Sequence, residues 1–206
     1  MRVVLAGFGP FPGVPFNPSA ILVRALARRR RPALADVVIS THVFATRYAA
    51  VDRDVAKLAA QKPDVILIFG VARRRRYLSI ETRARNAQSV LYPDASGHRP
   101  ARAMIAPREP RALRGTAPFR RMLGAVRTSG FPARLSRDAG RYLCNYAYWR
   151  ALEGARETST LVQFIHIPLI RLTPRRSRSR RHALALAPLV AAAEMLLVAL
   201  IAASRR

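Results

Sequence analysis

The single cysteine of the chain, Cys144, is the first residue whose chemistry draws attention. It is expected to open a helix behind Ala139-Gly140, where backbone N–H groups would help a thiolate. His166 ends an apolar run that predicts a buried strand, and Glu81 is expected in the long loop after another such run. A thiol, an imidazole that takes and returns its proton, and a carboxylate that orients the imidazole are the parts of nucleophilic catalysis.

The same residues also have plainer interpretations. A lone cysteine in apolar surroundings is more often a packing residue, and a histidine after a strand is often a hydrogen-bonded structural residue. Glu81 can equally cap a helix or lie on the surface. His42, His98 and His182 fit no ligand spacing, so we expect no metal site. Composition alone therefore leaves catalysis and packing both open.

The elements that must position these residues alternate between strand and helix. Ser19, after Asn17-Pro18, is expected to cap the first helix. Alternation of helices with apolar strands predicts an α/β sandwich with a mostly parallel sheet, whose sites form beyond the carboxyl ends of the strands. Strands are predicted at residues 3–6, 36–43, 65–69, 133–135 and 161–165, and helices at 20–28, 48–60, 118–129, from about 144, and at 183–203.

Length and composition limit the class of protein. A chain of 206 residues, 50% hydrophobic and 23% charged, indicates one globular domain with short appendages and excludes a disordered chain. The single cysteine excludes an internal disulfide framework and favours a reducing compartment. No signal-like segment opens the sequence, so we expect a cytoplasmic protein.

The charge is unusual: 37 basic residues against 11 acidic ones give a net charge of +26. Such a charge attracts nucleic acid, anionic lipid or acidic proteins. The arginines are scattered along the sequence, and few aromatic residues lie among them. This pattern favours a coding bias as the origin of the arginine excess, with the guanidinium groups spread over a solvated surface. A nucleic-acid partner is therefore the less favoured interpretation, although it stays open.

The C-terminal part divides into two segments. A basic connecting segment, 171–182, follows an α/β domain at 1–170, and an apolar helix is expected in 183–206. Residues 183–203 are long enough to span a membrane. Pro188 and Glu194 interrupt them and alanine keeps them weakly hydrophobic, so we favour a helix packed on the domain over a membrane segment.

Six motifs within about residues 1–170 resemble those of the pyroglutamyl-peptidase I (pyrrolidone-carboxylate peptidase) family, and they follow one another in the same order as in that family. A match of several ordered motifs is far more specific than any one of them. The motifs are Gly7-Phe8-Gly9-Pro10-Phe11-Pro12-Gly13 with Asn17-Pro18-Ser19; Lys62-Pro63-Asp64 with Gly70; Arg75, Ile80-Glu81, Ala84 and Asn86; Pro93-Asp94 with Gly97; Ser136, Ala139-Gly140 and Tyr142-Leu143-Cys144-Asn145; and Phe164-Ile165-His166-Ile167-Pro168.

The resemblance implies a three-layer α/β/α sandwich and a cysteine peptidase that removes an N-terminal pyroglutamyl residue from peptides. Cys144 would be the nucleophile, His166 the general base and Glu81 the orienting acid. The family's aromatic pocket for the lactam ring implies roles for Phe8 and Phe11, with Asn17 supporting the loop and Val71 in the substrate site.

The resemblance calls for no metal or other cofactor, and it implies pyroglutamylated peptides as partners and a homo-oligomer, dimer or tetramer. The alternative is a non-catalytic relative that binds polyanions or other proteins through its basic surface. Departures from the family pattern stand at Arg73, Arg74 and Leu91, and the likeness ends near Arg171. The arginine run 73–76 beside the cleft suggests a preference for peptides with an acidic residue after the pyroglutamate.

Overall fold

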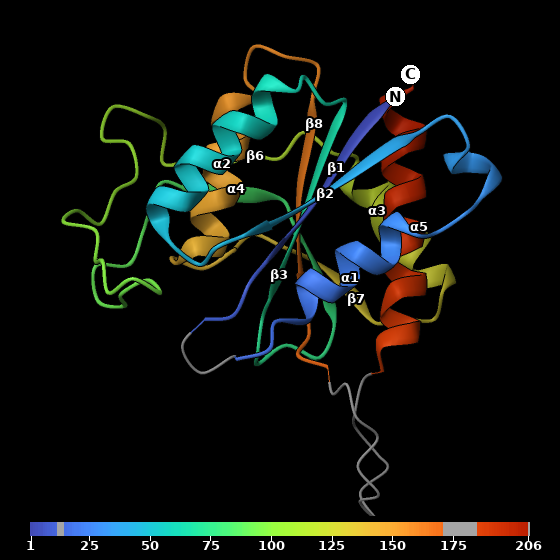
Figure 1. The fold of residues 1–206 in the computed structure, drawn as a ribbon, viewed down its shortest axis with the longest axis horizontal. Coiled ribbons are helices and arrows are strands. Elements are labelled where there is room, and N and C mark those ends of the chain that lie inside the picture. Colours follow the sequence, from blue (N-terminus) through green and yellow to red (C-terminus); the bar gives the residue numbers. More distant parts are fainter. Residues whose placement is uncertain (12–14, 171–184, 206) are drawn as a thin grey trace, which may run out of the picture.

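A central sheet runs through the molecule, and helices cover both of its faces (Figure 1). The computed structural model describes residues 1–11, 15–170 and 185–205. In chain order the elements are β1 (Arg2–Phe8), α1 (Pro18–Ala27), the 3₁₀ helix η1 (Pro32–Leu34), β2 (Val38–Phe44), α2 (Tyr48–Ala60), β3 (Val65–Val71), β4 (Leu78–Glu81), β5 (Arg83–Arg85), β6 (Ala112–Arg114), α3 (Phe119–Thr128), β7 (Ala133–Ser136), α4 (Leu143–Gly154), β8 (Leu161–Ile167) and α5 (Leu186–Ser204).

Six strands form the central sheet in the order β2-β1-β3-β8-β4-β7. All neighbours are parallel except β4 and β8, which run antiparallel. β5 and β6 form a separate antiparallel pair. Every residue of β3 is buried, because this strand lies in the middle of the sheet and has a helical layer on each face. The predicted sheet, mostly parallel and read from continuous apolar runs, is present.

Side chains alternate along β1 between two cores. Val3 and Leu5 pack with α1, α3 and α5 on one face, whereas Val4 and Ala6 pack with α2 and α4 on the other. Figure 1 shows the same division, with α2 and α4 on one side of the sheet and α1, α3 and α5 on the other. The architecture is therefore the expected three-layer α/β/α sandwich.

The predicted cap of the first helix is wrong by two residues. Asn17 caps α1, and its side-chain Oδ1 accepts a hydrogen bond from the Ser19 amide at 3.1 Å. Pro18 has the fixed φ that suits the first helical position, so the residue before it becomes the cap. Ser19 instead lies inside the helix, where its Oγ accepts from the Phe8 amide at 2.9 Å and ties the end of β1 to α1.

The C-terminal helix α5 packs against α1 and α3. Its 19 residues are long and apolar enough to cross a membrane by length and composition. Leu196 and Leu200 are nevertheless buried in the core beside the sheet, and the buried Glu194 accepts from Arg31 Nε at 3.0 Å. The basic connecting segment 171–182 and residues 183–184 lie outside the described residues, so the predicted division of the chain stays a prediction.

Asn145 fastens the start of α4 to β5. Its side chain is fully buried, and Oδ1 accepts from the Arg85 amide at 2.8 Å. Nδ2 donates to the carbonyl oxygens of Arg85 and Ala87, both at 2.8 Å. These three hydrogen bonds fix the helix turn that carries Cys144.

We predict that Asn145→Ala lowers the free energy of unfolding by about 3 kcal/mol, because it removes three hydrogen bonds and leaves the part-buried Arg85 amide and Ala87 carbonyl without the side chain that pairs with them. Urea denaturation measures this. Gln61→Ala, which removes an exposed amide at the end of α2, should change the free energy by less than about 0.5 kcal/mol. Equal, small effects of the two substitutions would contradict the anchoring role.

Candidate active site

Glu81 and His166 meet on two neighbouring strands. β4 and β8 pair with Ser79 opposite His166 and Glu81 opposite Phe164. His166 Nδ1 lies 2.8 Å from Glu81 Oε1, and both side chains are buried. An ionised carboxylate only accepts hydrogen bonds, so this contact assigns a proton to Nδ1; in the neutral imidazole Nε2, on the other side of the ring, can then accept a proton.

The expectation that Glu81 lies in a long loop is wrong, because it is the last residue of β4. Ser79 and Glu81 are both fully buried polar residues, and they alternate with Leu78 and Ile80. Such alternation imitates a strand with one solvated face, so the sequence conceals that both faces are covered.

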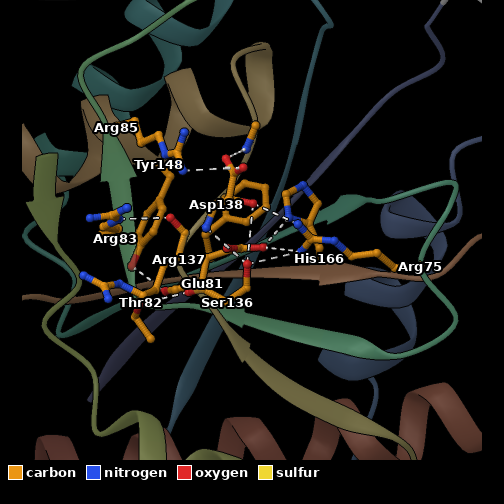
Figure 2. A network of polar contacts seen from close by, with 12 residues as sticks. Arg75, Glu81, Thr82, Arg83, Arg85, Ser136, Arg137, Asp138, Tyr148 and His166 are labelled. Carbon is orange, nitrogen blue, oxygen red and sulfur yellow. Dashed lines mark hydrogen bonds and ion pairs between the residues drawn. The ribbon is translucent and has the colours of Figure 1, made fainter. Parts of the chain in front are cut away.

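Arg75 is a further partner of the buried Glu81 carboxylate. Its Nη1 lies 2.6 Å from Glu81 Oε1, and its Nη2 donates to the Asp138 carbonyl at 2.8 Å (Figure 2). Burial on its own raises the pKa of the Glu81 carboxyl, but His166, Ser136 and Arg75 together hold that pKa below its usual value. Glu81 is therefore ionised at neutral pH.

The Cys144 sulfur lies over the strand next to His166. Cys144 is the second residue of α4, and a Cβ on Gly70 would lie 2.8 Å from its Sγ and 2.7 Å from the Phe164 ring. Only glycine leaves room for this approach. Gly70 is the register partner of His166 in the parallel pair β3–β8, and such partners direct their side chains to the same face. The thiol and the imidazole thus share one face on adjacent strands.

The thiol is neutral in this environment. Burial and the negative charge of Glu81 raise the pKa of Cys144 to about 12, although Arg75 and a backbone amide oppose them. A neutral thiol is a weak nucleophile, so it needs a proton acceptor close by. The unprotonated Nε2 of His166 is the group on the same face that can accept that proton.

A narrow, mostly apolar slot adjoins the sulfur, and all four expected substrate-binding residues line it. Its interior measures about 20 Å³, room for about one water molecule, so a substrate ring needs wall side chains to move aside. The walls are Phe8, Phe11, Asn17, Thr46, Val71, Tyr142, Leu143 and Cys144.

Hydrogen bonds to main-chain oxygens hold the slot walls. Asn17 Nδ2 donates to the Gly9 carbonyl at 3.0 Å, and Thr46 Oγ1 donates to the Pro10 carbonyl at 2.9 Å. Tyr142 Oη donates to Pro93 at 2.8 Å. Sequence reasoning missed Thr46 and Tyr142 as wall residues, although Tyr142 stands two positions before the cysteine.

Comparison with known proteins decides the family. A family model described as pyroglutamyl peptidase matches residues 1–204, nearly the whole chain. The chain belongs to the pyroglutamyl peptidase family. The family indicated by the six motifs is thereby confirmed.

Individual members of the family are similar over most of their length. A pyrrolidone-carboxylate peptidase from Vibrio vulnificus is 31% identical over 197 residues, which are 96% of this chain and 91% of that protein. Pyroglutamyl peptidase I from Bacillus amyloliquefaciens is 26% identical, with a TM-score of 0.83 over 98% of this chain and 97% of that one. A pyrrolidone carboxyl peptidase from Thermococcus litoralis has the same fold, with a TM-score of 0.86 at 22% identity over 98% of this chain and 93% of that one.

The raised pKa of the Cys144 thiol predicts how it reacts with iodoacetamide once the imidazole is gone. In His166→Ala the thiolate fraction at pH 7 is smaller than that of free cysteine, whose pKa is about 8.5. Alkylation should therefore be slower than that of N-acetylcysteine and rise about tenfold per pH unit from pH 7 to 10. Mass spectrometry follows it without background, because the chain holds one cysteine.

His42→Ala, a change on the edge strand β2, is the matched control and should react like the unchanged protein. A plateau near pH 9 in His166→Ala would show that burial does not disfavour the thiolate.

Proposed function

We propose that this member of the pyroglutamyl peptidase family hydrolyses the peptide bond after an N-terminal pyroglutamyl residue, with Cys144 as nucleophile, His166 as general base and acid, and Glu81 as the group that orients the imidazole. The observation that carries the proposal is the buried contact of His166 Nδ1 with Glu81, at 2.8 Å, on the face of the sheet over which the Cys144 sulfur lies.

The slot suits the chemistry of this substrate. Pyroglutamate is a flat, uncharged lactam ring, and Phe8, Phe11 and Val71 offer an apolar wall next to the sulfur. A free glutamyl residue carries charges that such a wall would have to desolvate without partners. When the lactam ring binds in the slot, the side chains of the wall move aside. The carbonyl of the scissile bond would then lie at Cys144 Sγ.

The residues support acyl transfer in two steps. The Cys144 proton passes to His166 Nε2 while the sulfur attacks the carbonyl carbon, and backbone N–H groups at the start of α4 stabilise the oxyanion. His166 then protonates the leaving amine as the C–N bond breaks, which leaves a thioester. Water attacks the thioester with His166 as base, pyroglutamate leaves, and the thiol is restored. Glu81 stabilises the imidazolium in both steps.

A thiol nucleophile also suggests where the enzyme acts. It must stay reduced, so the cytoplasm is the compartment we expect. The homo-oligomer, a dimer or tetramer, rests on the family resemblance and remains a prediction.

Replacing the nucleophile separates a peptidase from a non-catalytic relative. Cys144→Ala and Cys144→Ser should each lower turnover of a pyroglutamyl chromogenic substrate by at least about a thousandfold, because neither offers a thiolate. Both variants should keep the thermal unfolding midpoint of the parent within about 3 °C. Full activity in either folded variant would remove Cys144 from the mechanism.

Two arginines near the slot predict a preference among substrates. Arg73 and Arg74 are exposed in the turn after β3, the strand whose Val71 lines the slot. Peptides with an acidic residue after the pyroglutamate should have a kcat/KM several times that of peptides with a basic residue, and salt should weaken this preference. Arg73→Gln/Arg74→Gln should abolish it.

Arg24→Gln/Arg28→Gln removes the same charge from the exposed side of α1 and its end, and it should keep the preference. Equal turnover of acidic and basic substrates by the parent would refute the role of Arg73 and Arg74.

A further inference from the structure

Arginine side chains line a second hollow, which is distinct from the slot. It is a groove of about 740 Å³ between the β5–β6 pair, the start of α3 and the end of β7. Of the residues that the structure describes, no Asp or Glu lines it. We call this hollow the arginine groove. The arginines in its lining are Arg83, Arg114, Arg120, Arg121 and Arg137.

Many arginines of this basic chain lack a carboxylate partner, but the arginine groove brings five such arginines together in the lining of one hollow. Elsewhere Arg31 pairs with Glu194, Arg75 with Glu81 and Arg150 with Asp52. Within the described part of the chain, none of the five groove arginines forms an ion pair. Residues 12–14 and 171–184 contain no Asp or Glu either. Five like charges therefore face one groove without internal neutralisation.

Two of these guanidinium groups are held in place. Arg83 Nε donates to the Arg137 carbonyl at 3.0 Å. The guanidinium of Arg114 lies 5.6 Å from the centre of the Phe119 ring, a cation–π distance. Side chains that are already ordered lose less entropy when a ligand binds, so the groove is partly organised for an anion.

The first turn of α3 adds to the unbalanced charge. Pro118 stands at the cap position and makes no side-chain capping bond, and the first turn holds no acidic residue. Arg120 and Arg121 instead place two cations at the positive end of the helix dipole, an unfavourable arrangement. An anion bound there would accept from the free N–H groups and relieve the repulsion.

We propose that the arginine groove binds a run of phosphate groups, as found in polyphosphate or along a nucleic-acid backbone. Guanidinium groups match phosphate oxygens in pairs, and five of them suit a ligand with several charges in a row. Among the described residues, Phe119 is the one aromatic ring in the lining, and it is buried, so the described lining offers no stacking platform for bases. Recognition would therefore be of phosphates, independent of base sequence.

The arginine groove is separate from the reacting groups. In Figure 2, Arg83 and Arg137 lie on one side of Glu81, and His166 and Arg75 on the other. The lining of the groove shares no residue with that of the slot, so a ligand in the groove would leave the slot open to a small substrate.

Calorimetric titration with sodium tripolyphosphate at about 50 mM salt tests the proposal, together with fluorescence anisotropy of a labelled thymidine oligonucleotide. The variant is Arg120→Gln/Arg121→Gln, whose side chains are exposed. The control is Arg24→Gln/Arg28→Gln, which removes the same net charge elsewhere. Turnover of a small pyroglutamyl substrate should be unchanged in both, which shows that each is folded.

We expect saturable tripolyphosphate binding at one site, weakened at least about tenfold by the groove variant and less than about twofold by the control. Binding should raise the thermal midpoint of the parent. If the oligonucleotide binds too, its salt dependence should have a slope near −0.7 for each phosphate contacted and become shallower in the variant. If only tripolyphosphate binds, free polyphosphate is the ligand.

Equal losses in the two variants would show attraction to the net charge alone and overturn the proposal. Absence of saturable binding, or binding of polyglutamate without tripolyphosphate, would overturn it as well.

Discussion

The contact between Glu81 and His166 is the constraint on which the rest of the site depends. A buried carboxylate is costly unless it is paired, and here one oxygen receives both His166 and Arg75. The contact requires β4 to run antiparallel to β8, against the direction of the other pairs in the sheet. Because of this one antiparallel pair, Glu81 at the end of β4 lies beside His166 near the end of β8. The imidazole lies on the face where α4 starts, because His166 is the register partner of Gly70, over which the Cys144 sulfur lies.

Burial hinders ionisation of the Cys144 thiol but strengthens the contact between Glu81 and His166. It also excludes water from the slot. The thiol is therefore expected to react only as its proton passes to His166, when a substrate carbonyl reaches the sulfur. Gly70 permits this arrangement, because any larger residue would separate the sulfur from the strand. Asn145 holds the helix turn from the other side.

The central strands β3 and β8 could be predicted from the largely apolar stretches at 65–69 and 161–165, since such stretches are typical of buried parallel strands. β4 could not be predicted, because its buried polar residues Ser79 and Glu81 interrupt the apolar pattern. β5 and β6 could not be predicted either, because each has three residues and pairs only with the other. The slot residue Phe8 followed from family motifs, whereas Thr46 joins the slot through tertiary contacts. The scattered arginines suggested a solvated surface, and only folding shows that Arg83 and Arg120 line one groove.

The most direct test is acid-quenched mass spectrometry of the enzyme during turnover of a pyroglutamyl ester, in the parent and in Glu81→Gln. One pyroglutamyl group is expected on the peptide that contains Cys144, formed as fast as the alcohol is released in the first turnover. Glu81→Gln should form it at least about a hundredfold more slowly, because the imidazole loses its charged partner. Turnover with no label on Cys144, or labelling of Glu81→Gln at the parent rate, would contradict the account.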